Sequence, residues 1–371
     1  MTIPLLDLEA QLAQYREAAL QAITRVVDSQ HFIMGPEVKA FEAELAAYLE
    51  LPAAVGVSSG TDALLACLMA LEVGPGDEIV TSPFSFFATA GVAARLHARP
   101  VFADIDPATF NLTEAGVRAA IGKRTKAVIP VHLFGQMCDL GSFYDEPDRP
   151  VIVEDAAQAI GARLRGKGTG HFGEYTCTSF FPAKNLGAFG DAGGVACQDP
   201  ARADRVGIIR LHGSKPKYLH HVVGGNFRLD AIQAAVLRVK LPLLDGWAAG
   251  RRANAARYDA LLAEAGLVER GLVIPPAVQP DSLHVYNQYV VRAQRRDELM
   301  GHLGARGIGH AVYYPRPLHL QPCFADLGYG PGDFPHAERA CAEVLALPVY
   351  PELPIDGQRT VVEALRTFYG I

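Results

Sequence analysis

The sequence lacks the features that mark secreted or membrane proteins. Its six cysteines are scattered and none forms a C-x-x-C pair, so we expect reduced core residues rather than disulfides or zinc ligands. No apolar run approaches the length of a membrane span. The N-terminal segment Met1–Asp7 has no basic region followed by an apolar stretch, so it does not read as a signal peptide. We therefore expect a cytoplasmic protein without a membrane partner.

The charge balance offers no basic surface. The 34 Lys and Arg residues face 40 Asp and Glu residues, for a net charge of −6, which argues against a nucleic-acid partner. Half of the residues are hydrophobic and 20% are charged, a balance typical of globular proteins. A length of 371 residues is large for one core. The pattern changes near Gly246, so we predict a large domain over 1–246 and a small domain over 247–371.

Strand and helix patterns alternate in the first two thirds of the chain. This alternation predicts an α/β fold with a mostly parallel sheet sandwiched by helices. A smaller α+β domain is expected to follow, with strands at His284–Arg292 and Gly309–Tyr314 and a last helix at Gly357–Tyr369. The strands expected in the large domain are Ala53–Val57, Glu78–Thr81, Pro100–Ile105, Lys126–Val131, Val151–Val153 and Gly194–Cys197.

Asp155 and Lys184 are the most informative pair of polar residues. Asp155 follows the β-branched run Val151–Val153, which is typical of a buried parallel strand. Lys184 lies between an aromatic run and a glycine-rich turn. Pyridoxal phosphate needs such a pair, because a lysine amine binds it as a Schiff base and a carboxylate partners its ring nitrogen. Taken singly, the aspartate could cap a helix and the lysine could be a solvated charge.

The segments around these two residues resemble a known family. Glu154–Gln158 and Ser179–Gly187 are similar to motifs of the DegT/DnrJ/EryC1/StrS sugar aminotransferases, and the resemblance runs from Ile3 to the C-terminal helix. It implies a fold-type I aminotransferase fold, pyridoxal 5′-phosphate as cofactor, and amination of keto groups on nucleotide-linked sugars for amino-sugar biosynthesis.

The resemblance also assigns roles to individual residues. Lys184 and Asp155 are the implied catalytic residues, and Gln158 is expected to hydrogen-bond the cofactor's 3-hydroxyl. Ser58–Thr61 has small and hydroxyl residues at a helix start, which suits a phosphate or a simple N-cap. The implied cofactor-binding residues are Gly60, Thr61, Phe86, Asp155, Gln158, Ser179, Lys184 and Asn226.

The resemblance further implies a homodimer with shared active sites. In the family, the asparagine matching Asn226 reaches the cofactor phosphate of the partner subunit; otherwise an asparagine here is a helix cap. Lys215 and Tyr218 lie in a basic loop that suits a diphosphate substrate, although such loops are often only solvated. His220 and His221 have no third ligand at a suitable spacing, so no metal is expected.

Tyr313–Pro322 resembles the family's C-terminal active-site motif, with tyrosine at 313 where the family often has histidine. It supplies Tyr314 and His319 as candidate substrate contacts. His319 could equally be a loop histidine whose hydrogen bonds are made within the protein.

The predicted activity is transamination. Relatives that dehydrate their substrate have histidine in place of the lysine, whereas Lys184 is present here. The form of this motif resembles members that aminate C3 of a nucleotide-diphosphate keto sugar, and L-glutamate is the expected donor. Amination at C4 and a non-catalytic regulatory role are the alternatives. A dinucleotide-dependent oxidoreductase is disfavoured, because Ser58–Thr61 does not supply G-x-G-x-x-G.

Overall fold

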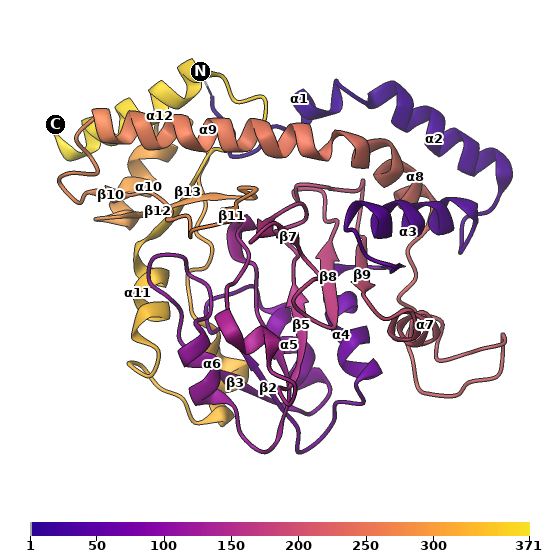
Figure 1. The fold of residues 1–371 in the computed structure, drawn as a ribbon. Helices are drawn as coiled ribbons and strands as arrows, with labels where there is room; N and C mark the ends of the chain where they lie inside the picture. Colours follow the sequence, from indigo (N-terminus) through magenta and orange to yellow (C-terminus); the bar gives the residue numbers. More distant parts are fainter. Residues whose placement is uncertain (1) are drawn as a thin grey trace.

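The computed structural model describes residues 2–371, and a seven-stranded sheet forms its centre (Figure 1). The strand order is β1-β9-β8-β5-β4-β2-β3. The β1–β9 and β9–β8 pairs are antiparallel and the other four pairs are parallel, which confirms the predicted mostly parallel sheet. The strands are β1 (Ala53–Val57), β2 (Glu78–Thr81), β3 (Arg99–Phe102), β4 (Thr125–Ile129), β5 (Val151–Asp155), β8 (Tyr175–Ser179) and β9 (Gly193–Cys197).

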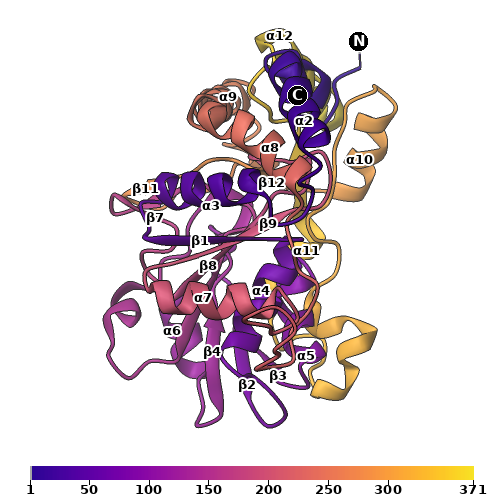
Figure 2. The ribbon, with the colours of Figure 1, turned by 90° about the vertical axis from the view of Figure 1, so that its right-hand side faces the viewer.

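Helices cover both faces of this sheet. Along β4, Ala127 and Ile129 pack into one core cluster while Val128 packs into another, so the strand is buried on both faces. Figure 2 shows α3 and α7 on opposite sides of β1. One face carries α4 (Gly60–Ala70), α5 (Ala88–Arg95) and α7 (Pro200–Ile209), and the other carries α3 (Pro36–Tyr48), α6 (Glu114–Ala120) and α8 (Ala231–Lys240).

A second core lies in the C-terminal part of the chain. It is built on an antiparallel sheet of β10 (Val273–Ile274), β12 (Tyr289–Ala293) and β13 (Val344–Leu347), with α10 (Arg296–Gly304) and α12 (Ile355–Tyr369) packed on it. Ile3, from the N-terminus, joins this core and pairs with Ile308. A small third sheet contains β6 (Arg163–Leu164), β7 (Lys167–Gly168) and β11 (Ser282–Leu283).

The two cores are joined by α9 (Leu244–Glu264), the long helix at the top of Figure 1. Leu244 packs in the core beside α3 and α8, whereas Tyr258 and Leu262 pack in the C-terminal core. Gly246 lies in the first turn of this helix and does not break it. The division at residue 246 stays a prediction, with a continuous helix rather than a flexible linker at that point.

The C-terminal part also folds back over the edge of the large sheet. Phe324 and Phe334 pack against Phe102 of β3, and α11 (Pro335–Glu343) follows them. The Asp104 carboxylate accepts hydrogen bonds from the first amides of α11, at 3.0 Å from both His336 and Ala337. This segment covers the exposed backbone of an edge strand.

Several predicted elements differ from the structure in detail. Of the strand expected at His284–Arg292, only 289–292 lies in a strand, β12. Gly309–Tyr314 forms no regular strand: Ala311 makes an isolated bridge to Ala346 of β13, and the Gly309 amide donates to the Ile3 carbonyl at 2.7 Å. The helical periodicity of Leu8–Val27 predicts a helix, and the structure has two helices over this region, α1 (Leu8–Leu12) and α2 (Arg16–Ser29). The residue pattern near Cys138–Tyr144 also predicts a helix, whereas the structure has only a short 3-10 helix at Gly141–Asp145.

Candidate active site

A pocket of about 560 Å³ opens at the carboxyl ends of the parallel strands. Asp155 ends β5 and Ser179 ends β8, and parallel neighbours deliver their ends to the same edge of the sheet. Lys184 enters the pocket from the loop between β8 and β9. The sequence-predicted residues that line it are Gly60, Thr61, Phe86, Asp155, Gln158, Ser179, Lys184 and Tyr314.

Asp155 presents a buried carboxylate to this pocket. Its Oδ2 accepts a hydrogen bond from Thr89 Oγ1 at 2.9 Å, and its Oδ1 accepts one from the Ala157 amide at 3.2 Å. Burial raises the pKa of Asp155 above its ordinary value, while the two hydrogen bonds and the Lys184 charge oppose that rise. A cationic group beside Asp155 would favour its ionised form. A protonated ring nitrogen is such a group, and it requires a carboxylate partner of this kind.

Lys184 carries an amine suited to act as a nucleophile. Burial lowers the pKa of Lys184 to about 8, and the negative charge of Asp155 only partly opposes this change. The neutral amine, which is the reactive form, is therefore more populated near neutral pH than in a solvated lysine.

Gln158 is held at the pocket wall from two sides. Its Oε1 accepts a hydrogen bond from the Phe134 amide at 2.6 Å, and its Nε2 donates to the Tyr314 hydroxyl at 3.2 Å. Gln158 and Tyr314 come from distant parts of the chain, so this contact ties the C-terminal motif to the end of β5.

Phe86 is the aromatic residue of its run that lines the pocket. Its side chain is 58% exposed, and its ring lies 6.3 Å from that of Tyr314. Phe84 is buried in the core, and Phe87 stacks on Phe324 at 5.5 Å. Phe86 is thus the one of the three placed to cover a ring in the pocket.

The start of α4 provides an anion-binding environment. Ser59 caps this helix by accepting a hydrogen bond from the Asp62 amide, which leaves the Gly60 and Thr61 amides without a partner within residues 2–371. A Cβ atom on Gly60 would lie 2.7 Å from that of Ser179, so glycine is needed for this close approach. The approach sets the Ser179 hydroxyl beside the helix N-terminus, an arrangement that fits a phosphate.

Other residues of the site were not predicted from the sequence. Thr89 bonds Asp155 from α5, but nothing in the local sequence distinguishes it from a core threonine. Asn287 and Gln288 line the pocket, and their side-chain carbonyl oxygens are buried without a hydrogen-bond partner in the described chain. The sequence feature that could have indicated Asn287 and Gln288 is the presence of two adjacent amide side chains within an apolar strand pattern.

Four of the predicted residues lie outside the pocket of their own chain, and three of these four belong to one segment. Asn226, Lys215 and Tyr218 belong to the segment that follows α7 and projects from the body in Figure 1. The Lys215 ammonium pairs with Asp204 at 2.6 Å, and Tyr218 is 81% exposed. None of the three lines the pocket of its own chain, and their roles stay predictions.

His319 is buried outside the pocket, and a role in substrate binding stays a prediction. It is fully buried, its Nε2 lies 3.2 Å from Glu338 Oε1, and its ring packs edge-on against Phe334. It does not line the pocket. Of the two interpretations left open by the sequence, these contacts favour the loop histidine.

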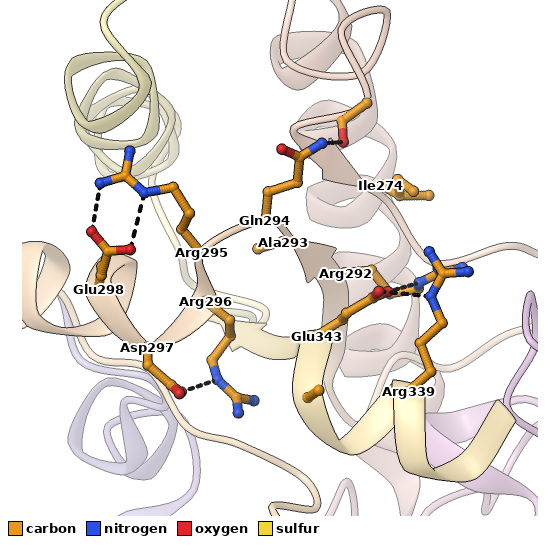
Figure 3. Close-up of a pocket in the computed structure, with 12 residues that line it drawn as sticks. Ile274, Arg292, Ala293, Gln294, Arg295, Arg296, Asp297, Glu298, Arg339 and Glu343 are labelled. Atoms are coloured by element: carbon orange, nitrogen blue, oxygen red, sulfur yellow. Dashed lines mark hydrogen bonds and ion pairs between the residues drawn. The ribbon is translucent and has the colours of Figure 1, made fainter. Parts of the chain in front are cut away.

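A second pocket, of about 520 Å³, lies in the C-terminal part and has a different character (Figure 3). Arg292 and Arg339 both donate to Glu343, while Arg295 pairs with Glu298 and Arg296 with Asp297. The positive charges are thus largely balanced by acids within the pocket itself, and none of the sequence-predicted residues is in it.

The described residues contain neither a metal cluster nor a membrane helix. Within residues 2–371, no three His, Cys, Asp or Glu side chains gather closely enough to hold a metal ion. His220 and His221 instead bond the main-chain carbonyls of His212 and Lys215. No helix in this range combines the length and apolar character that a bilayer crossing needs.

Comparison with known proteins identifies the family. Residues 13–366 match the model of the DegT/DnrJ/EryC1/StrS aminotransferase family. The chain belongs to this family. It is 49% identical to a "Pleiotropic regulatory protein" of Geobacillus stearothermophilus, over 100% of this chain and 99% of that protein. It is 43% identical to the dTDP-3-amino-3,4,6-trideoxy-alpha-D-glucose transaminase of Streptomyces venezuelae, over 98% and 95%.

Solved structures agree with this assignment. The crystal structure of S. venezuelae DesV in complex with a ketimine intermediate superimposes with a TM-score of 0.94 at 42% identity, covering 99% of this chain and 98% of that one. Five relatives with 34–43% identity have names that place an amino, keto or dehydro group at C3 of a sugar. The chain is a fold-type I sugar aminotransferase, and the predictions of family, fold and enzyme class are confirmed.

Pyridoxal 5′-phosphate is the cofactor of this enzyme, and the pocket fits it. Lys184 would bind it covalently and Asp155 would face the ring nitrogen. Gln158 would lie at the ring's hydroxyl side, with the α4 N-terminus and Ser179 at the phosphate. The unpartnered amides at Gly60 and Thr61 and the buried Asp155 carboxylate are the structural observations that support this fit.

Proposed function

We propose that the enzyme transfers an amino group from L-glutamate to the C3 keto carbon of a nucleoside-diphosphate-linked sugar. The observation that carries this proposal is the convergence of Lys184, Asp155 and Gln158 in one pocket. The C3 position is supported by the relatives whose names state that position. The exposed Phe86 ring and the unpaired side-chain carbonyl oxygens of Asn287 and Gln288 leave one side of the pocket suited to a polar ring such as a sugar.

The residues of the pocket divide the chemical work. Pyridoxal phosphate, when bound, supplies a ring that accepts electrons from a carbanion. The Lys184 amine acts as general base toward the α-carbon proton of the donor, and a pKa near 8 suits a group that must both take and return a proton. Asp155 holds the proton on the ring nitrogen, and Gln158 fixes the ring's orientation.

We further propose that the active enzyme is a homodimer in which each subunit completes the other's site. The segment after α7 supports this proposal, because Tyr218 and Val223 expose 81% and 90% of their surface. Such apolar exposure on a projecting segment is typical of a protein contact. Asn226 lies at the base of the same segment and would reach the cofactor phosphate of the partner.

The test is an absorption spectrum of the purified protein before and after L-glutamate is added. We expect a visible band that is replaced by a shorter-wavelength band, and D-glutamate and the Lys184→Ala variant are the controls. Nucleotide-linked 3-keto and 4-keto sugars are then compared by the rate at which the visible band returns. Proton NMR of the product locates the new amino group, and an amine at C4 would replace the C3 proposal.

A regulatory role is the second candidate, favoured by the name of the relative that is 49% identical. A purely regulatory protein needs no lysine amine with a lowered pKa beside a buried carboxylate. A visible band that ignores L-glutamate, together with no conversion of any keto sugar, would favour this role over the transaminase.

A further inference from the structure

Lys240 is a buried lysine without a carboxylate partner. It is the last residue of α8 and is only 2% exposed. Among residues 2–371 it forms no salt bridge, and its Nζ donates a hydrogen bond to the Gly187 carbonyl. Burial lowers the pKa of Lys240 to about 8. An unpaired buried charge destabilises a fold, so the burial of Lys240 has to be explained by its other contacts.

Three aromatic rings surround the Lys240 ammonium. Its Nζ lies 4.9 Å from the ring centre of Tyr15, 5.7 Å from Trp247 and 6.0 Å from Phe189. The faces of aromatic rings attract cations, most strongly in Trp and Tyr. The Trp247 indole is itself fixed, because its Nε1 donates to Gln14 Oε1 at 3.0 Å. The Lys240 ammonium is thus stabilised by aromatic rings rather than by an acid. The three rings hold the side chain so that its Nζ faces the Gly187 carbonyl.

The carbonyl that Lys240 holds belongs to the loop that carries Lys184. Gly187 follows Lys184 by three residues, and a Cβ atom at Gly187 would collide with the Pro182 carbonyl. The Lys184 amide donates to the Phe181 carbonyl at 2.8 Å, which closes the same turn. A displacement of Gly187 is therefore transmitted directly to Pro182 and Lys184.

We propose that Lys240 is a positioning residue for Lys184. Its ammonium fixes the Gly187 carbonyl and thereby sets the direction from which the Lys184 amine enters the pocket. The inference rests on the proposed function, since it concerns the amine that would carry the cofactor and move the proton. A neutral side chain of similar length fills the aromatic box but cannot hold the carbonyl in this way.

The test compares Lys240→Met with the wild type in the full-length protein. Methionine keeps the volume and removes the ammonium. We expect the glutamate half-reaction to slow about 10- to 100-fold at saturation, with little change in KM, because misplacement of a reacting group mainly affects the chemical step.

In the cofactor-free protein we expect the pKa of the Lys184 amine to rise, since a looser loop admits water. Reductive methylation with ¹³C-formaldehyde followed by NMR measures that pKa, and Lys184→Ala assigns the signal.

Gln358→Met is the matched control. Gln358 is also fully buried, and its Nε2 donates to the Asn254 carbonyl at 2.7 Å, but it lies on α12, outside the Lys184 pocket. This variant is expected to lower the unfolding temperature while leaving both the half-reaction and the pKa of Lys184 unchanged. If Lys240→Met behaves in the same way, Lys240 is only structural and the proposal is overturned.

Two further outcomes are separable. If Lys240→Met does not fold, Lys240→Leu replaces it, because leucine likewise has no group that can donate to the Gly187 carbonyl. An unaltered Lys184 pKa in that variant also overturns the proposal. If the wild type ignores L-glutamate, the proposed function fails. The pKa of Lys184 in the cofactor-free variants then still decides the positioning role by itself.

Discussion

Asp155 is a buried acid. Its carboxylate accepts hydrogen bonds from the Thr89 hydroxyl and the Ala157 amide, which oppose the rise in pKa that burial causes. Replacing Asp155 by asparagine keeps the shape and removes the charge that would hold a proton on the cofactor ring. We expect Asp155→Asn to slow the glutamate half-reaction by about 10²–10³-fold, the usual loss when a preorganised electrostatic contact is removed. Stopped-flow absorbance measures the rate. Thr89→Val, which removes one hydrogen bond and leaves the charge, should lose far less; equal rates in wild type and Asp155→Asn would refute the role.

At this scale the sequence predicted what is contiguous along the chain. Asp155, Gln158 and Lys184 stand in two short motifs, so their types and spacing are visible without a structure. Lys240 and Thr89 act through contacts made between distant segments. A lysine near a helix end and a threonine within a helix are ordinary residues until the fold places them.

β5 is anchored by the residue before Asp155. Glu154 is fully buried and accepts hydrogen bonds from the amides of Gly170, Phe172 and Gly173 at 2.9, 3.1 and 2.7 Å. Its Oε2 also lies 2.8 Å from His132 Nε2, and the Cys138 amide donates to His132 Nδ1, so Nε2 carries the proton toward Glu154. One carboxylate therefore satisfies four donors that hold the end of the strand.

Glu154→Gln tests this anchoring. An amide has one oxygen where the carboxylate has two, so at least one buried donor would face another donor. We expect a loss of about 3 kcal/mol in the free energy of unfolding, as for a buried group that loses its partner. Urea unfolding followed by circular dichroism measures it. Glu50→Gln, at the exposed pair with Arg163, should change little; comparable losses in both variants would contradict the anchoring role.

Elements with strong local patterns were predictable, and elements that depend on distant contacts were not. Ala53–Val57 and Glu78–Thr81 were placed at the observed bounds because short apolar runs between turns specify buried strands. Gly309–Tyr314 has the same apolar character, yet within residues 2–371 its backbone hydrogen bonds are limited to Gly309 with Ile3 and Ala311 with Ala346. Tyr313 and Tyr314 line the pocket instead. The division near Gly246 stays a prediction; at that point the neighbouring Leu244 and Trp247 are buried and α9 is continuous.

The proposed sharing of active sites makes a prediction for the whole molecule. Lys184 lines the pocket of its own chain, whereas Asn226 lies on the exposed segment and would serve the partner's pocket. Lys184→Ala is expected to be inactive, and Asn226→Ala to be strongly impaired at low cofactor concentration. In a mixed dimer of these two variants, one site combines an intact Lys184 with an intact Asn226, while the other site lacks both.

Mixing the two variants and allowing the subunits to exchange should therefore restore activity that neither has alone. Random exchange puts half of the chains into mixed dimers with one intact site of two, so we expect about a quarter of the wild-type rate. The rate of the full transamination at limiting cofactor measures it, and size-exclusion chromatography establishes the dimer. Mixing Lys184→Ala with Asp155→Asn is the matched control, because both residues belong to the same pocket and no intact site can form. No gain on mixing Lys184→Ala with Asn226→Ala, despite demonstrated exchange, would place Asn226 outside the partner's site.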